Sequence, residues 1–435
     1  MNIVYCCEAR PTSRVVHSIR TTDPSNHVTT NQDAHGHCDD GLGQRSSFAG
    51  ATEDLWTALK GGNYPNALTA IAAGADLKFA DAAFGTPLNL AACWADAEVV
   101  KALIDGKSEV NFVHPGNGYT PLINAATWGN EEAVKLLLAA GADISIKTKL
   151  GQTLLSQAIT GCDLEIIRTL VDAGADPLEK YAIGTLGDQT LMNALVTAKD
   201  GEERVVYLTG LSTPMSKMGV TLPARISGAK ASDFSTLEEI AVYLLGKGAD
   251  PNQTVAGTWG NILMQSLDFG KTGVARALIE NGAKADFDEK KGFNVKDRTG
   301  DAAKLPNFTY TNGDFVLAAV LTNNLDFVKL MVDKYPKYVT KIYEGSGTVR
   351  CTGATTNYNA EGINLLMVAA DRGNLEIVNY LISKGAGKGD AVKIKQFKGD
   401  KFCPMFSVMF TMGFARNSNN QAVIDAVKAA GYGKE

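Results

Sequence analysis

Histidine and cysteine side chains, which can bind metals or take part in catalysis, are concentrated near the start of the 435-residue chain. The densest group is the run His35-Gly36-His37-Cys38-Asp39-Asp40, with Cys6-Cys7 upstream of it. Imidazole and thiolate groups suit zinc or copper, but this spacing matches none of the regular zinc patterns. Adjacent cysteines also cannot easily both bind one tetrahedral ion. We therefore interpret the run as part of a polar tail and expect no metal site and no cofactor.

Catalytic constellations are equally sparse in the sequence. Beyond residue 50 the only histidine is His114, which we expect at a loop tip. The sequence has no Gly-rich phosphate loop followed by lysine, and no histidine pair at helical spacing with a glutamate. A Ser–His or Cys–His mechanism would have to use His114 or a histidine of the first 50 residues. We expect that the chain is not an enzyme.

Charge and hydropathy narrow the class of protein. The formal net charge of −5 argues against a general nucleic-acid binder, which needs a basic face. Apolar residues make up 45% of the chain, too many for wholly disordered protein, and no apolar run reaches the length of about 18 residues that spans a bilayer. The later cysteines are scattered singly, as is typical of buried thiols in a reducing compartment. We expect a cytoplasmic protein, with a secreted effector as the alternative.

The first 50 residues differ in composition from the rest. They contain four arginines and no lysine, are rich in Thr, Ser, Asn and Asp, and show neither a 3.6-residue nor a 2-residue period. We interpret residues 1–50 as a polar, disordered leader of different origin or selection history. Residues 51–435 form the folded body.

The body repeats itself. Gly85-Thr86-Pro87-Leu88 with Ala91-Ala92 can be laid over Thr120-Pro121-Leu122 with Ala125-Ala126. Gly141 and Gly174, 33 residues apart, each open a Gly-Ala-Asp triplet. Between these landmarks the apolar spacing predicts two short helices per unit, for example at 121–128 and 131–139. Pro121 suits a first helical turn, and Gly129 and Gly141 suit helix ends.

This pattern resembles the ankyrin repeat. The resemblance implies an all-α, elongated solenoid in which stacked helix pairs bury an apolar stripe that one pair cannot cover alone. About nine units are indicated, near residues 52–84, 85–117, 118–150, 151–184, 187–256, 260–290, 314–340, 362–388 and 402–431.

Departures from the ankyrin pattern fall at defined places. Lys107 occupies a position where the pattern has glycine, which puts that turn in doubt, and Cys162 replaces the glycine between two helices, where it is expected to be partly exposed. Four insertions interrupt the array, near 198–235, 286–313, 336–360 and 388–401. Strand-like stretches at 205–208, 308–310 and 338–343 indicate partly ordered decorations.

A binding surface follows from the resemblance, because ankyrin arrays generally bind partners through loop tips and the groove lined by their first helices. Trp94 and Trp128 occupy equivalent groove positions in adjacent repeats. The expected partner-binding residues are Trp94, Tyr119, Thr127, Trp128, Lys147, Lys149, Gln152 and Phe269. Two alternatives are that an insertion or the leader covers the tryptophans, or that they are structural.

The expected function is a scaffold or adaptor that binds a protein partner. The alternative is an effector or regulatory protein with an activity or a second binding site in the insertions. Their charged residues are Glu202, Glu203, Arg204, Asp286, Asp288, Glu289, Lys290 and Lys291. We expect a monomer, and a dimer through the Met- and Phe-rich C-terminal unit is the alternative.

Overall fold

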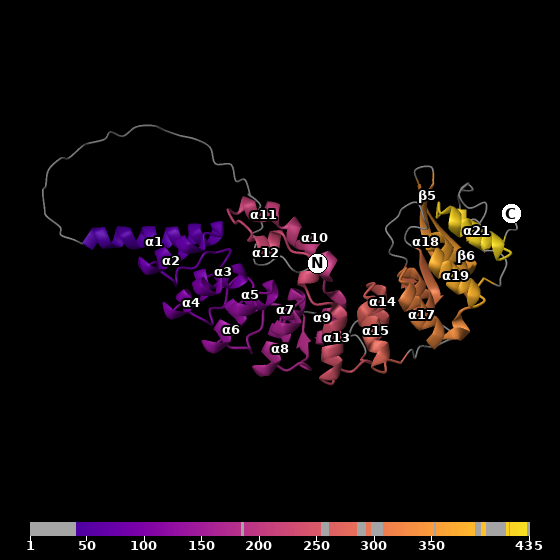
Figure 1. Cartoon of the computed structure of the whole chain (residues 1–435), viewed down its shortest axis with the longest axis horizontal. Helices are drawn as coiled ribbons and strands as arrows, with labels where there is room; N and C mark the ends of the chain where they lie inside the picture. The colour runs from indigo at the N-terminus through magenta and orange to yellow at the C-terminus, as the bar shows by residue number, and fades with distance from the viewer. Residues whose placement is uncertain are drawn as a thin grey trace, which may run out of the picture. The chain divides into compact units, whose positions relative to one another are not determined.

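The computed structural model describes residues 41–183, 187–253, 261–284, 293–296, 308–351, 354–387, 393–396, 415–416 and 418–432 (Figure 1). The chain divides into two compact units. Unit 1 holds the residues up to Ala194 together with Ala198–Thr236, and unit 2 holds Leu195–Thr197 and the residues from Leu237 onward.

Helix pairs dominate both units, as the repeat pattern predicts. In unit 1 they are α1 (Gly41–Gly61), α2 (Tyr64–Ala72), α3 (Pro87–Trp94), α4 (Ala97–Asp105), α5 (Pro121–Trp128), α6 (Glu131–Ala139), α7 (Leu154–Gly161) and α8 (Leu164–Asp172). Helix α9 (Leu191–Thr197) follows. In unit 2 they are α13 (Leu237–Gly246), α14 (Ile262–Asp268), α15 (Thr272–Glu280), α16 (Phe315–Leu321), α17 (Leu325–Lys334), α18 (Leu365–Arg372) and α19 (Leu375–Ser383). In the stretch expected to hold the ninth unit, the structure describes helix α21 (Gln421–Ala429).

A threonine begins the first helix of three successive pairs. The Oγ1 atoms of Thr86, Thr120 and Thr153 each accept a hydrogen bond from the backbone N–H three residues later. Such an N-cap satisfies a donor that the helix itself cannot. The repeated threonine therefore starts each helix at the same place in its repeat.

The two helices of a pair differ in burial. All eight residues of α3 are buried, whereas the buried residues of α4 are Val99, Val100 and Leu103, along one stripe. Helices α3, α5 and α7 pack side by side, and α4, α6 and α8 form a second row (Figure 1). A Cβ built on Gly161 would lie 2.5 Å from the Ala126 carbonyl oxygen, so α7 approaches α5 at a distance that only glycine allows.

The turn at Lys107 keeps the geometry of the repeat. Lys107 has φ 66°, in the left-handed region, where Gly74 and Gly141 have φ 86° and 82°. Its N–H donates to the Ile104 carbonyl at 2.9 Å, as the N–H of Gly141 does to Leu138 at 3.0 Å. The doubt that the lysine raised is resolved, because lysine adopts the glycine conformation there.

Unit 2 also contains a five-stranded antiparallel sheet built from three of the predicted insertions. Its strands are β3 (Phe293–Lys296), β4 (Thr309–Gly313), β5 (Ile342–Cys351), β6 (Ala354–Asn364) and β7 (Lys393–Gln396), in that spatial order. The β3–β4 and β5–β6 hairpins lead directly into α16 and α18, whereas β7 follows α19 and pairs with β6. Side-by-side pairing of these hairpins is a non-local arrangement.

Buried polar contacts hold this sheet against the helices. Asp314, fully buried, accepts hydrogen bonds from the backbone N–H groups of Val316 and Leu317 and caps α16. The Tyr343 hydroxyl of β5 donates to the same carboxylate at 2.9 Å, and the Lys341 ammonium lies 3.2 Å from it. Burial raises the pKa of Asp314.

Two expectations from the sequence need correction. The all-α assignment is too narrow, because this sheet and a two-stranded one, β1 (Tyr181–Ala182) with β2 (Asp188–Gln189), accompany the mostly helical repeats. The strand-like stretch 205–208 lies in a helix, α10 (Gly201–Gly210), whereas 309–310 lies in a strand.

The expected leader overlaps the first helix. Helix α1 begins at Gly41, inside the stretch 1–50, and residues 1–40 lie outside the described part of the chain. Within the described residues, no helix is both long and apolar enough to cross a bilayer.

Candidate interaction surface

The two tryptophans meet, as their equivalent positions in adjacent repeats predict. Their ring centroids lie 5.0 Å apart with the planes at 88°, an edge-to-face contact. Trp94 is only 2% exposed and Trp128 is half-buried. Trp94 therefore offers almost no surface to a partner in this conformation, and the pair joins α3 to α5.

The insertion at 198–235 covers the helix ends beside these tryptophans. It folds as α10, α11 (Ser212–Lys217), α12 (Ala224–Ser227) and the short 3-10 helix η1 (Ala231–Asp233), on the side of the α3–α5–α7 row (Figure 1). The insertion thus contacts the residues that directly precede both tryptophans.

Two arginines of the insertion bind the last turns of three successive first helices. Arg225 Nη2 donates to the Cys93 carbonyl oxygen at 3.0 Å. Arg204 Nη2 donates to the Thr127 carbonyl oxygen at 2.9 Å, and its Nη1 donates to that of Thr160. Cys93, Thr127 and Thr160 occupy equivalent places in α3, α5 and α7, so the insertion uses the repeat itself as its binding site.

Arg204 is a buried cation in the described structure without a carboxylate partner there. Its positive charge is compensated by the carbonyl groups at the ends of α5 and α7, where the helix dipoles carry partial negative charge. The guanidinium also lies over the Phe234 ring, 5.5 Å from its centroid. Burial lowers the pKa of Arg204, but the arginine remains charged at neutral pH.

Cys162 anchors both ends of the insertion. Its Sγ donates to the Lys199 carbonyl oxygen at 2.9 Å, and its own carbonyl oxygen accepts from the Ser235 N–H at 2.8 Å. Cys162 has φ 53° and is fully buried, so the expectation of partial exposure is wrong. The departure from the repeat pattern coincides with the point where the insertion attaches.

Of the remaining expected site residues of unit 1, Tyr119 and Gln152 lie in loops and Thr127 lies in the last turn of α5. Tyr119 donates to Gln157 Oε1 at 2.7 Å, and Thr127 Oγ1 donates to the Ile123 carbonyl. Gln152 is half-buried beside Thr148. None of these three side chains is wholly free to bind a partner.

The expected basic edge is partly neutralised. Lys147 forms an ion pair with Glu179 at 2.6 Å, and Lys149 donates to the Pro115 carbonyl oxygen. Both lysines remain exposed. Phe269, the last expected residue, is exposed in unit 2 directly after α14.

Apolar side chains at the loop tips were not singled out from the sequence. They are Phe79, Val113, Leu150 and Leu178, exposed by 54, 47, 40 and 47%. Each lies in the loop that follows a second helix, in four consecutive repeats. They share no fixed spacing from the Gly-Ala-Asp triplets, so the repeat pattern predicts only that they lie in loops outside the helices.

The sequence candidates for catalytic and metal chemistry lie only partly within the described residues. No group of three His, Cys, Asp or Glu residues there could hold a metal ion. Of the charged insertion residues, Glu203 and Arg204 have structural contacts, Glu203 in the capping box of α10. Residues 286–291 and the run 35–40 lie outside the described part.

Comparison with known families gives two kinds of match. A model described as ankyrin repeats in three copies matches residues 55–148 and 88–181, and a single ankyrin-repeat model matches residues 361–391. No curated protein matches the chain. The matched residues include the helix pairs α3–α8 of unit 1 and the pair α18–α19 of unit 2. The chain therefore contains ankyrin repeats over residues 55–181 and 361–391.

Proposed function

We propose that the chain is a scaffold that binds a protein partner through the loop tips of unit 1. Ankyrin repeats are generally protein–protein interaction modules, which supports the class of function. The observation that carries the choice of surface is the row of exposed apolar side chains at Phe79, Val113, Leu150 and Leu178.

The repetition of these side chains distinguishes them from ordinary surface residues. Single exposed apolar residues are normal on any protein. Here one lies in each of four consecutive loops that follow second helices, whereas the hydrogen bonds of Arg204 and Arg225 reach the ends of the first helices. Apolar anchors of this kind carry much of the energy of protein interfaces, and Lys147 and Lys149 would supply a polar rim.

In this proposal the tryptophans of the predicted groove, Trp94 and Trp128, have a structural role. The insertion binds the ends of α3, α5 and α7, and Trp94 is buried beside them. We propose that the tryptophan pair holds adjacent repeats in register and so sets the spacing of the loops.

Several further properties belong to the same proposal. We propose that the chain is not an enzyme, acts in the cytoplasm as a monomer and does not bind nucleic acid. The net charge of −5 and the scattered cysteines support this. The alternative of an activity in the insertions has less support, because Arg204 is committed to internal contacts.

The test removes the apolar loop tips without touching the helices. A variant with Val113→Asp, Leu150→Asp and Leu178→Asp is compared with a control that carries Val206→Asp and Val242→Asp, two exposed apolar positions outside the loop tips. Proteins captured from cells that express the protein are quantified by mass spectrometry. The loop variant should lose a specific partner at least about tenfold while the control retains it, since each lost apolar anchor costs about 1–2 kcal/mol. Equal capture by both would refute this surface.

A further inference from the structure

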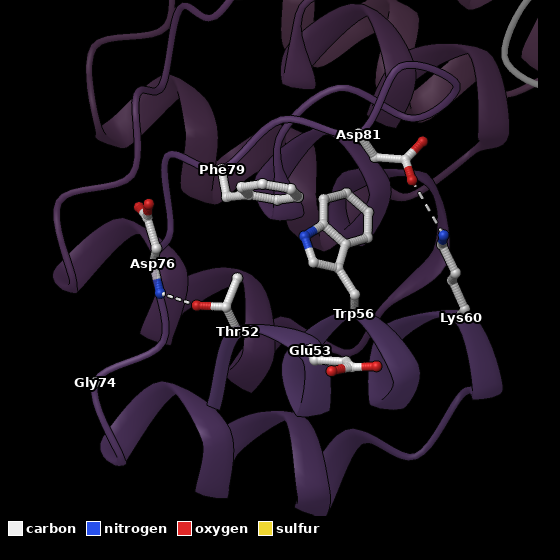
Figure 2. Close-up of a pocket in the computed structure, with 8 residues that line it drawn as sticks. All are labelled: Thr52, Glu53, Trp56, Lys60, Gly74, Asp76, Phe79 and Asp81. Carbon is white, nitrogen blue, oxygen red and sulfur yellow. Dashed lines mark hydrogen bonds and ion pairs between the residues drawn. The ribbon is translucent and has the colours of Figure 1, made fainter. Parts of the chain in front are cut away.

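A pocket of about 690 Å³ lies in the first repeat, between α1 and the loop that follows α2 (Figure 2). Its volume falls in the range of about 300–1,000 Å³ that is typical of ligand sites. Trp56 of α1 and Phe79 of the loop supply its aromatic surfaces, and Thr52, Glu53 and Asp76 line the same space.

Trp56 has an unused hydrogen-bond donor at this pocket. The side chain is 7% exposed, and its Nε1 atom has no hydrogen-bond partner among the described residues. A buried indole N–H usually finds an acceptor, and an unpaired one costs stability. Figure 2 shows the indole nitrogen facing the part of the pocket that Thr52, Asp76 and Phe79 line. A ligand with an acceptor, such as a peptide carbonyl, would accept a hydrogen bond from this indole N–H.

The charges of the pocket favour a cation. The Lys60 ammonium lies 3.2 Å from the Asp81 carboxylate, so these two charges offset one another. Glu53 has no ion-pair partner in the described part of the chain. The Asp76 carboxylate accepts a backbone N–H from Lys78 at 2.9 Å and likewise has no cation there. Two carboxylates thus remain uncompensated beside two aromatic rings.

We infer that this pocket binds an arginine side chain presented by a peptide segment of the protein partner. A guanidinium is flat, stacks on aromatic faces and donates in a fork that matches carboxylates, whereas a lysine ammonium offers only a point charge. The arginine would lie between Trp56 and Phe79 and donate to Glu53 and Asp76, and the peptide carbonyl would accept from Trp56. This inference rests on the proposed function, because it names the chemistry of one partner contact.

The test observes the Trp56 N–H directly. The full chain is labelled with ¹⁵N at its tryptophan indoles, and the Trp56 signal is assigned by its loss in Trp56→Phe. N-acetyl-arginine methylamide is then titrated, with the citrulline analogue as an uncharged probe of the same shape and the lysine analogue as a cation of different shape. The arginine probe should shift the Trp56 signal saturably, with a Kd of about 1–10 mM as expected for so small a ligand. The citrulline and lysine probes should bind at least about fivefold more weakly.

Charge variants give the matched control. The double variant Glu53→Gln and Asp76→Asn should weaken the arginine response at least about fivefold, because both carboxylates are lost. Both side chains are exposed, so the fold should persist. The variant Glu98→Gln with Asp172→Asn removes the same net charge from exposed positions on α4 and α8 and should leave the response unchanged. No saturable shift, or equal shifts with arginine and citrulline, would overturn the inference.

The two proposals fail separately. If the loop-tip variant loses its partner while Glu53→Gln with Asp76→Asn retains it and shows an unchanged arginine titration, the scaffold function stands and the arginine pocket is wrong. If the arginine titration behaves as expected and no partner depends on Val113, Leu150 and Leu178, the pocket stands and the loop-tip surface is wrong.

Discussion

Arg204 and Thr127 lie 77 residues apart in the sequence, and the arginine's Nη2 donates to the threonine's carbonyl oxygen at 2.9 Å. The same guanidinium reaches the Thr160 carbonyl in the next repeat. One side chain therefore donates hydrogen bonds to carbonyl groups at the ends of two neighbouring first helices. A long insertion becomes part of the array because the repeat presents carbonyl groups at regular intervals.

Replacing Arg204 with methionine is expected to destabilise unit 1 by about 2–3 kcal/mol. The substitution keeps an apolar stem but leaves two buried carbonyl groups without a charged donor, and such bonds contribute about 1.5–3 kcal/mol each before relaxation. Urea unfolding followed by circular dichroism measures the change. Arg168→Met, which removes an exposed arginine paired with Glu165, should shift stability by less than about 0.5 kcal/mol. Equal shifts in both variants would contradict the role assigned to Arg204.

Lys107 and Cys162, two non-glycine residues of unit 1 with left-handed backbone, should respond to glycine with opposite signs. At exposed Lys107, glycine removes a conformational cost of about 1–2 kcal/mol and adds unfolded-state entropy worth about 0.5–1, so Lys107→Gly should stabilise by about 0.5–1 kcal/mol. Cys162→Gly removes the same conformational cost but also removes a buried thiol and its hydrogen bond to the Lys199 carbonyl oxygen. It should therefore destabilise the fold by about 1 kcal/mol. Thermal unfolding of both variants tests this, and a stabilising Cys162→Gly would show that the thiol is not an anchor.

Acidification should weaken the fold through His114. Its ring is buried, its Nδ1 accepts from the Gly116 N–H at 3.0 Å, and burial lowers its pKa below the ordinary value of about 6.5. The folded state therefore binds fewer protons than the unfolded state. The stabilisation is complete above pH 6.5 and declines as the pH falls toward the lowered pKa, by at most about 1.4 kcal/mol per pH unit.

The control for this pH dependence is His114→Gln. Unfolding free energies of both proteins are compared between about pH 7.5 and 5, so that other titrating groups cancel in the difference. The wild type should lose stability more steeply than the variant. Parallel curves would mean that His114 is protonated equally well in both states.

The two tryptophans should contribute unequally to the stability of the fold. Trp94→Ala should cost about 3–5 kcal/mol, as for other buried aromatic side chains, and Trp128→Ala should cost less because that ring is half-buried. Melting temperatures of the two variants measure this. A loss at Trp94 of less than about 1 kcal/mol would restore it as a candidate partner contact.

Local signals predicted the repeats well. The threonine at each helix start, the paired alanines and the Gly-Ala-Asp turns act within one repeat, and the structure places α3, α5 and α7 where these residues indicate. The stretch 205–208 resembles a strand because its β-branched and aromatic residues are typical of strands, yet it lies in α10. The capping box of Asp200 and Glu203, which starts α10, was the stronger signal.

Non-local contacts account for what the sequence did not reveal. Arg204 meets its carbonyl partners, and β4 pairs with β5, across distances at which no spacing rule applies. The pattern likewise identified Trp94 and Trp128 as neighbours but could not show that an insertion folds over the adjacent helix ends.

Hydrogen exchange of the full chain tests most directly whether the insertion is a folded part of the array. If it is, the amides of α10 should be protected, with an opening free energy within about 2 kcal/mol of that of α5, and Arg204→Met should lower protection in α10 more than in α13. Exchange of α10 at the rate of an unstructured peptide, while α5 stays protected, would contradict the account, because the helix ends beside Trp94 and Trp128 would then be open to a partner.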